Sequence, residues 1–205
     1  MRKIIICGIS MKENVDQVVY VSDDKSIPTA NIPVRYPVNA VLAETVKSSD
    51  EYKIVLLVKK DNNDYHEQNI RFFKDEFEQA ISGIPAAVSY SIIETDFAQN
   101  RLVHEQLMGA IVEELEIGSH IIVDTTYGSK DLPIIIFTAL NFAEKFLNCT
   151  IDNIIYGQAS FVDGHAANTK LCDMSTLYYL SSVTNTIRAV EPDKAKTMLK
   201  SLLSL

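Results

Sequence analysis

The chain has 205 residues, of which 47% are hydrophobic and 22% are charged, a composition typical of a compact folded domain and not of a fibrous or disordered protein. Its formal net charge of -8 argues against a protein that coats duplex DNA or an anionic membrane, because both require an extended basic surface. The longest apolar stretch, residues 132–142, is well short of the roughly 20 residues of a membrane-spanning helix. The apolar run near the amino terminus is too short for a signal peptide, and we therefore expect a cytoplasmic protein.

The hydrophobic pattern alternates between strands and helices along the chain. Its first half predicts, in order, a strand at 3–7, a loop at 8–12, a strand at 18–21, a loop or hairpin at 22–37, a helix at 38–46, a strand at 52–58, a helix at 66–81 and a strand at 86–93. Its second half predicts a helix at 102–115, a strand at 121–123, a helix from 132 to about 148, a strand at 153–156, and helices at 173–187 and 193–203. The sequence therefore predicts an α/β fold, a Rossmann-like, doubly wound and mainly parallel sheet with helices on both faces.

A polar turn, residues 124–130, connects a predicted strand to the long apolar helix. In open α/β sheets ligands bind at the carboxyl ends of the strands, which is where this turn is expected to lie. The turn offers four hydroxyls and a cation, which suit phosphate or ribose better than a metal ion, from Thr125, Thr126, Tyr127, Ser129 and Lys130. Asp124 is expected to accept backbone N–H bonds and to pin the turn. The alternative interpretation is that the serine and threonines only cap the following helix.

The usual nucleotide and metal motifs do not occur in the sequence. The loop after the first strand, residues 8–12, contains a single glycine, so the GxGxxG fingerprint is missing, and there is no GxxxxGK[ST] motif. The four histidines form no HExxH motif, and Cys7, Cys149 and Cys172 are widely spaced without a CxxC motif. We therefore expect reduced thiols, no metal site and no resident cofactor. The loop at 8–12, here called the first loop, and the polar turn can lie side by side at adjacent strand ends.

Residues 124–128 read Asp-Thr-Thr-Tyr-Gly and are followed by an apolar helix, a strand and Tyr156-Gly157. This order resembles the DxTHG signature of CRISPR-associated Rossmann-fold (CARF) domains, which accompany type III CRISPR systems. Tyr127 stands where that family usually has histidine, so the shape of the loop is kept while the role of the imidazole is open. The likeness extends over nearly the whole chain, through the first loop, the helix and strand at 37–58, and Asp173-Met174-Ser175 at the start of a helix.

The resemblance implies a homodimer in which one symmetric pocket receives a cyclic oligoadenylate second messenger, with tetra-adenylate the favoured ring and hexa-adenylate the alternative. Two-fold symmetry suits a ring. The residues that it places in the pocket are Gly8, Ile9, Ser10, Met11 and Lys12 from the first loop, and Thr125, Thr126, Tyr127, Gly128, Ser129 and Lys130 from the polar turn. It further implies a ligand-sensing domain over residues 1–190, with 191–205 forming a helix that ends a stand-alone protein or leads to an effector.

Two functional hypotheses follow, and a third is kept open. In the first, the dimer senses the ring and its changed arrangement is read by a fused or separate effector in antiviral defence. In the second, the protein is a metal-independent ring nuclease, in which a ribose 2'-hydroxyl attacks the adjacent phosphodiester while Lys130 meets the developing charge and Ser10 orients the phosphate. In the third, a Rossmann-like domain binds an unrelated nucleotide or acts as a regulator, because the fold alone does not specify a function.

Overall fold

A computed structural model describes residues 1–22, 27–60, 65–96, 98–187 and 191–203. The chain divides into two compact units, Met1–Asp173 and Met174–Leu205. The division falls after the last strand of the sheet, so the helix that follows this strand groups with the C-terminal helix. The domain boundary expected at residue 190 lies outside the described residues.

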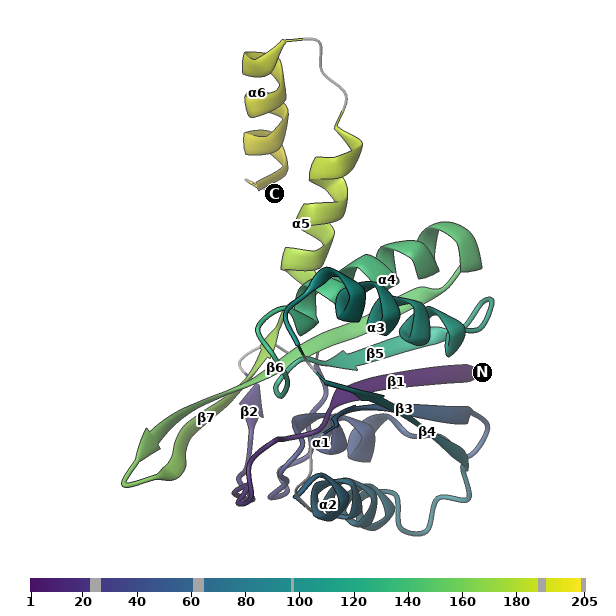
Figure 1. Cartoon of the computed structure of the whole chain (residues 1–205), viewed down its shortest axis with the longest axis vertical. Coiled ribbons are helices and arrows are strands. Elements are labelled where there is room, and N and C mark those ends of the chain that lie inside the picture. Colours follow the sequence, from purple (N-terminus) through teal and green to yellow (C-terminus); the bar gives the residue numbers. More distant parts are fainter. Residues whose placement is uncertain (23–26, 61–64, 97, 188–190, 204–205) are drawn as a thin grey trace. The chain divides into compact units, whose positions relative to one another are not determined.

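The first unit is built around a sheet of seven strands (Figure 1). These are β1 (Arg2–Gly8), β2 (Val21–Ser22), β3 (Glu51–Lys59), β4 (Ala87–Thr95), β5 (His120–Asp124), β6 (Thr150–Val162) and β7 (His165–Asp173). Their order across the sheet is β2-β7-β6-β5-β1-β3-β4. The strands from β6 to β4 run parallel to one another, β7 is antiparallel to β6, and β2 is parallel to β7. The predicted α/β fold with a mostly parallel, Rossmann-like sheet is confirmed.

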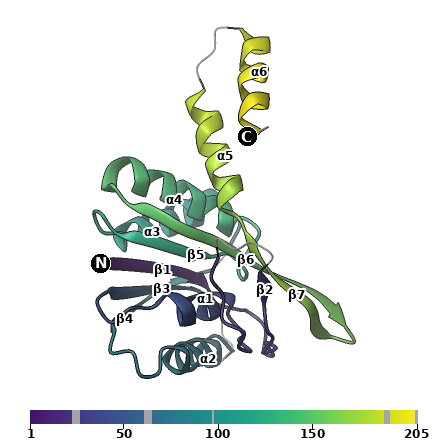
Figure 2. The same cartoon turned by 180° about the vertical axis from the view of Figure 1, so that it is seen from behind.

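Four helices cover the two faces of this sheet, as the predicted alternation requires. They are α1 (Pro37–Thr45), α2 (Tyr65–Ala80), α3 (Arg101–Glu113) and α4 (Leu132–Leu147). Helices α1 and α2 lie on one face and α3 and α4 on the other, which Figure 2 shows from the opposite side. A proline at the start of α1 and of α4 fits the first turn of a helix, where its missing N–H leaves no bond unmade. Helix α4 ends at Asn148, which adopts the left-handed conformation that commonly terminates helices.

The core lies between the central strands and these helices. Ile4, Ile5 and Ile6 on β1 and Ile54 and Leu56 on β3 are fully buried, because helices cover both faces of the parallel sheet. Each such side chain contributes roughly 1.5–3 kcal/mol through its removal from water. Two of the free thiols, Cys7 and Cys149, are buried, and Cys172 is half-buried. This packing holds the carboxyl ends of β1 and β5 rigidly beside each other.

The β6–β7 hairpin is the part of the first unit that the sequence pattern did not predict. A strand was expected only at 153–156, but β6 continues to Val162 and β7 begins at His165. Asp163 and Gly164 form the connection with φ angles of 51° and 85°. Positive φ at both central residues is typical of the tight turns that close hairpins, and Asp-Gly is their usual sequence. In Figure 1 the hairpin projects past the ends of the central strands.

The segment that precedes α1 is mostly irregular, as its prolines predicted. The strand expected at 18–21 is reduced to β2 and to an isolated bridge between Val18 and Val34. Residues 23–26 of the loop or hairpin expected at 22–37 lie outside the described residues. The described remainder forms no helix before Pro37.

The described residues of the second unit form the helices α5 (Ser175–Thr186) and α6 (Pro192–Leu203), which confirms the helices predicted there. Helix α6 has no buried residue, and Met198, Leu202 and Leu203 are exposed. None of the helices in the described parts of either unit combines the length and the apolar character needed to cross a bilayer.

Candidate functional site

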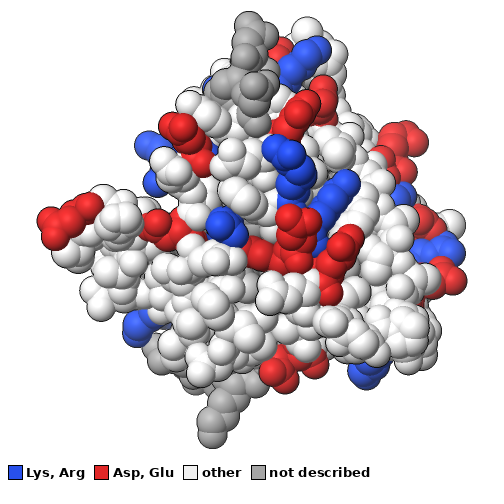
Figure 3. All heavy atoms as spheres, turned by 90° about the horizontal axis from the view of Figure 1, so that it is seen from below, with Lys and Arg blue, Asp and Glu red and all other residues white. Residues whose placement is uncertain are grey.

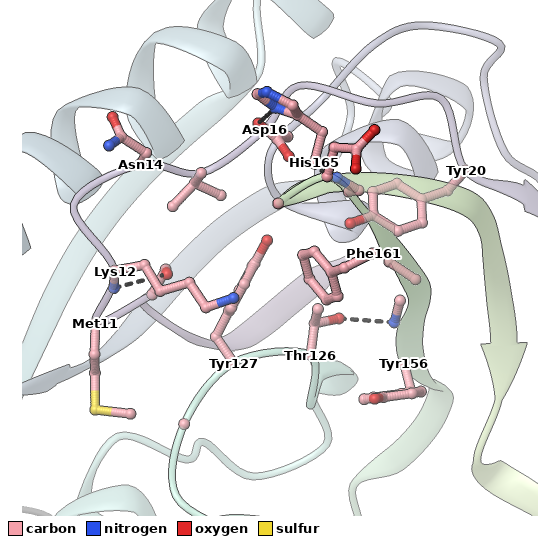
Figure 4. A pocket seen from close by; sticks show the side chains of 18 residues that line it. Met11, Lys12, Asn14, Asp16, Tyr20, Thr126, Tyr127, Tyr156, Phe161 and His165 are labelled. Carbon is pink, nitrogen blue, oxygen red and sulfur yellow. Dashed lines mark hydrogen bonds and ion pairs between the residues drawn. The ribbon is translucent and has the colours of Figure 1, made fainter.

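A pocket of about 590 Å³ lies where β1 and β5 end and where the hairpin begins to project (Figure 4). This volume falls within the range of roughly 300–1,000 Å³ found for small-molecule sites. The lining residues are Ser10, Met11, Lys12, Asn14, Val15, Asp16 and Tyr20 after β1, Thr126, Tyr127 and Gly128 from the polar turn, and Tyr156, Gly157, Ala159, Phe161, Asp163, Gly164, His165 and Ala166 from the hairpin. The first loop and the polar turn therefore meet at one site, at the sheet edge where ligands of such folds bind.

The first loop is held in place by a buried asparagine of α2. The side-chain amide of Asn69 donates to the carbonyl oxygens of Ser10 at 2.9 Å and Lys12 at 2.8 Å. The Ser10 hydroxyl is itself buried and accepts the backbone N–H of Lys12 at 3.2 Å. These bonds fix the backbone while the Lys12 side chain remains exposed. Its ammonium lies 4.6 Å from the centre of the Phe161 ring, across the pocket.

Asp124 pins the polar turn, as its position predicted. The carboxylate is 0% exposed, and its two oxygens accept the backbone N–H groups of Thr126 at 2.9 Å and Val38 at 3.1 Å. Burial raises the pKa of Asp124, while these two N–H donors oppose the shift. Val38 belongs to the first turn of helix α1. The Asp124 side chain therefore connects the polar turn, which leads into α4 on one face of the sheet, to α1 on the opposite face.

The two threonines of the turn bond to β6. The Thr125 hydroxyl and backbone N–H each donate to the carbonyl of Ile155 at 2.9 Å. The Thr126 hydroxyl accepts the backbone N–H of Gly157 at 2.8 Å, a contact drawn in Figure 4. The turn is thus fastened on one side to β6 and on the other to α1.

Gly8 and Tyr127 bring the two loops into direct contact. A Cβ atom at Gly8 would lie 2.2 Å from the carbonyl oxygen of Tyr127, so only glycine allows this approach. The Tyr127 ring packs edge-on against Tyr36 at 5.4 Å, and its hydroxyl donates to the carbonyl of Arg35 at 2.9 Å. Burial raises the pKa of Tyr127 far above its ordinary value, so the phenol stays neutral. Tyr127 is therefore a fixed hydrogen-bond donor in the polar turn.

The structure brings together six of the residues that the sequence placed in the pocket. Ser10, Met11, Lys12, Thr126, Tyr127 and Gly128 line it. The other five do not line it in a single chain: Gly8, Ile9 and Thr125 are buried beneath it, Ser129 is half-buried, and Lys130 is exposed. The backbone N–H of Leu132 donates to the carbonyl of Ser129 at 3.1 Å, which starts the turn into α4 just where Lys130 lies.

Sequence reasoning missed the third wall of the pocket, which is aromatic. Tyr156 and Phe161 come from the hairpin, and Tyr20 comes from the segment before β2. The Asp-Gly pair at 163–164, set between residues of strand propensity, is a hairpin signal that would have revealed this wall. Burial raises the pKa of Tyr20 to about 12, so its phenol is also neutral near pH 7.

Asp16 links the segment after β1 to the end of the hairpin. Its carboxylate accepts the backbone N–H of Ala166 at 2.7 Å and lies 3.5 Å from the His165 ring. The bond from Ala166 is the main cause of a lowered pKa at Asp16, so this acid is ionised near pH 7. The Asp16 carboxylate therefore holds the start of β7 against the segment that follows β1.

The chemistry available in the pocket is stacking, hydrogen bonding, the positive charge of Lys12 and the carboxyl groups of Asp16 and Asp163. Lys12 is the only lysine or arginine among the lining residues of the described chain. Within the same described residues, no three metal-ligating side chains gather into a site. On the face drawn in Figure 3, lysine and arginine side chains are interspersed with acidic ones, which agrees with the net charge of -8. The pocket therefore suits a small ligand with aromatic and hydroxyl groups and a local negative charge.

No protein-family model and no curated protein matches the chain. The structure itself shows an α/β domain with a mostly parallel, Rossmann-like sheet of seven strands.

Proposed function

We propose that this chain senses a cyclic oligoadenylate in type III CRISPR antiviral defence and binds the ring across a homodimer. The observation that carries the proposal is the meeting of the first loop and the polar turn in one pocket at the carboxyl ends of β1 and β5. This is the placement that the resemblance to CARF domains implies. Tetra-adenylate is the ring we favour, and hexa-adenylate is the alternative.

The composition of the pocket supports a nucleotide ligand. Tyr156 and Phe161 offer exposed aromatic faces to bases, and Lys12 offers a cation to a phosphodiester. Within the described chain Lys12 is the only lysine or arginine that lines the pocket, and the chain as a whole carries a net charge of -8, which fits a small anion better than a nucleic-acid polymer.

Exposed apolar side chains, one in the pocket and one next to a lining residue on β6, support a second copy of the chain as the partner. Met11 is 41% exposed and Val162, at the end of β6, is 56% exposed. Such side chains gain by burial against another surface. An isologous dimer would join two equal pockets about a two-fold axis, and a ring with the same symmetry fits that arrangement. Occupancy would then change the arrangement of the dimer, which a fused or separate effector reads.

Calorimetry with cyclic tetra-adenylate and cyclic hexa-adenylate tests the proposal, with sedimentation equilibrium run beside it. We expect micromolar or tighter binding and one ring for every two chains. Gly8→Val serves as the disabled variant, because a side chain at position 8 collides with the carbonyl of Tyr127. The absence of binding by the unmodified protein at micromolar ring concentrations refutes the proposal.

Cleavage of the ring is the second candidate, and the position of Ser10 favours it. Ser10 lines the pocket with its hydroxyl held at a fixed place. In the reaction a 2'-hydroxyl attacks its neighbouring phosphorus, the bond to the 5'-oxygen breaks, and the proton passes to that oxygen, leaving a 2',3'-cyclic phosphate and a 5'-hydroxyl. In one chain the cation beside Ser10 is Lys12, while Lys130 is exposed outside the pocket.

Incubation of the protein with labelled ring in EDTA separates sensing from cleavage. Linear products with cyclic phosphate ends establish the nuclease, and a ring that is intact after hours rules it out. Lys12→Met and Lys130→Met are compared in the same assay. If Lys130 meets the developing charge, only its substitution slows cleavage without weakening binding of the ring.

A further inference from the structure

Phe161 is an aromatic ring placed at the pocket with no part in the core. It is 59% exposed on β6, two residues before the turn of the hairpin, and it lines the pocket. Its contact across the pocket is the Lys12 ammonium, 4.6 Å from the ring centre. Figure 4 shows the lysine reaching from the first loop towards this ring. A phenylalanine exposed to this extent adds little to the stability of the fold, which points to a role in binding.

The backbone beneath Phe161 is held on the segment that follows β1. Asp16 accepts the N–H of Ala166 at 2.7 Å, and the Thr169 hydroxyl donates to the carbonyl of Val19 at 2.6 Å. The paired strand β7 is also bonded to β2, the edge strand that follows this segment. The hairpin therefore presents the ring at a defined place above the first loop. A preset aromatic face loses little freedom when a ligand stacks on it.

We infer that Phe161 is the stacking platform for a nucleobase of the ligand, and that Lys12 leaves the ring to pair with the adjoining phosphate. This inference rests on the proposed function and names the part of the nucleotide that each side chain recognises. A lysine over an exposed ring is a weak contact, whereas a base stacked on an aromatic side chain contributes more. The exchange is favourable because both groups gain: the base covers the apolar face and the ammonium meets a full negative charge.

Two ligands that differ only in the base test this division of roles. Adenosine 5'-monophosphate carries base and phosphate, while ribose 5-phosphate lacks the base. Replacement of Phe161 by alanine should lower the affinity for adenosine 5'-monophosphate about 5- to 100-fold and leave the affinity for ribose 5-phosphate unchanged. Phe161→Tyr, which keeps the aromatic face, should stay within about twofold of the unmodified protein. Lys12→Met should lower the affinity for both ligands and reduce the salt dependence of their binding. NMR titration measures such weak affinities, and calorimetry repeats the series with the ring.

The chain contains a matched pair of control residues outside the pocket. Phe146, at the carboxyl end of α4, is 62% exposed, and the ammonium of Lys145 lies 5.3 Å from its ring centre. Phe146→Ala and Lys145→Met remove the same two chemical groups without touching the pocket. Both controls should bind every ligand as the unmodified protein does.

The outcomes distinguish this inference from the proposed function. If the protein binds the ring but Phe161→Ala binds all adenine ligands normally, the stacking role is wrong and the proposed function stands. If the protein binds the monophosphate but no ring, the proposed function fails, and a loss in Phe161→Ala still supports stacking. If no adenine ligand binds, both are overturned. A loss in Phe161→Ala that vanishes in the Lys12→Met background shows that Phe161 only positions Lys12, which also overturns stacking.

Discussion

Replacement of Glu76 by glutamine should destabilise the fold and loosen the pocket, although Glu76 does not line it. This buried carboxylate of α2 accepts the backbone N–H of Arg35 at 3.0 Å, the Arg35 guanidinium at 2.9 Å and the side-chain amide of Gln17 at 3.1 Å. The carbonyl of Arg35 in turn accepts the hydroxyl of Tyr127 at 2.9 Å. Glu76 therefore stabilises the segment to which the polar turn is bonded.

The size of the effect follows from burial and charge. The side chain of Glu76 is 5% exposed and that of Arg35 is 21% exposed, so the pair is largely shielded from water. Breaking a fully buried pair by removing one charge costs about 3–5 kcal/mol. Because Arg35 is partly solvated and glutamine keeps one acceptor oxygen, we expect a loss of about 2–4 kcal/mol in the free energy of unfolding. With a typical urea dependence of about 2 kcal/mol per molar, the unfolding midpoint falls by about 1–2 M.

Urea unfolding followed by far-UV circular dichroism measures this loss, and Glu78→Gln is the control. Glu78 lies on the same helix and is exposed, so the same chemical change there should shift the free energy by less than about 0.5 kcal/mol. Hydrogen exchange under native conditions then locates the change. The amides of residues 125–128 should lose protection in Glu76→Gln, because the Arg35 carbonyl is less firmly placed. Equal stability of the two variants, or unchanged exchange in the turn, would refute this reasoning.

Three further predictions concern the turn and its contacts. Because burial raises the pKa of Asp124, the stability that this group adds is complete below its unfolded pKa and is lost as pH rises through the folded value. The free energy of unfolding of the unmodified protein minus that of Asp124→Asn should therefore fall as the pH rises above about 4, the ordinary pKa of an aspartate, in urea titrations, and an increase would contradict the assignment. Gly8→Ala should lower the melting temperature and abolish ring binding, since its Cβ would lie 2.2 Å from the carbonyl oxygen of Tyr127. Gly109→Ala is the control: this position on α3 faces open space, so the substitution should stabilise the protein by about 0.5–1 kcal/mol. Thr126→Val, which leaves the N–H of Gly157 without its acceptor, should cost about 1–3 kcal/mol in the same urea assay, and a neutral result would show that water replaces the hydroxyl.

The parts of the fold that the sequence predicted are those governed by local pattern. The central strands are continuous apolar runs, and α4 is bounded by Pro133 and by Asn148, so their positions follow from periodicity and end signals. The role of Asp124 was predictable for a similar reason. A carboxylate that follows a buried strand has backbone N–H groups as its nearest donors.

The parts that escaped prediction depend on contacts far apart in the sequence. The outer half of β6 alternates polar and apolar residues only weakly, and its pairing partner β7 also lacks a buried face, so neither strand stands out alone. Asp16 meets Ala166 across 150 positions of sequence, which no local pattern encodes. The orientation of Lys130 is likewise decided by how the chain turns into α4, and residue type alone gives no information about it.

Tyr127 stands where the CARF signature, which the polar turn resembles, usually has histidine, and this difference bears on whether the proposed function is sensing or cleavage of the ring. A histidine at the tip of the turn would titrate near neutral pH and would be able to exchange protons with a bound ring. Tyr127 has neither property, since burial keeps its phenol neutral and its proton is donated to the carbonyl of Arg35 at 2.9 Å. The bond makes the turn more rigid and removes an acid–base group from it. A rigid turn favours binding of a ligand. Cleavage, in contrast, would have to proceed without an acid–base group in the turn and would depend on charge stabilisation by lysine, and for this reason we favour the sensor.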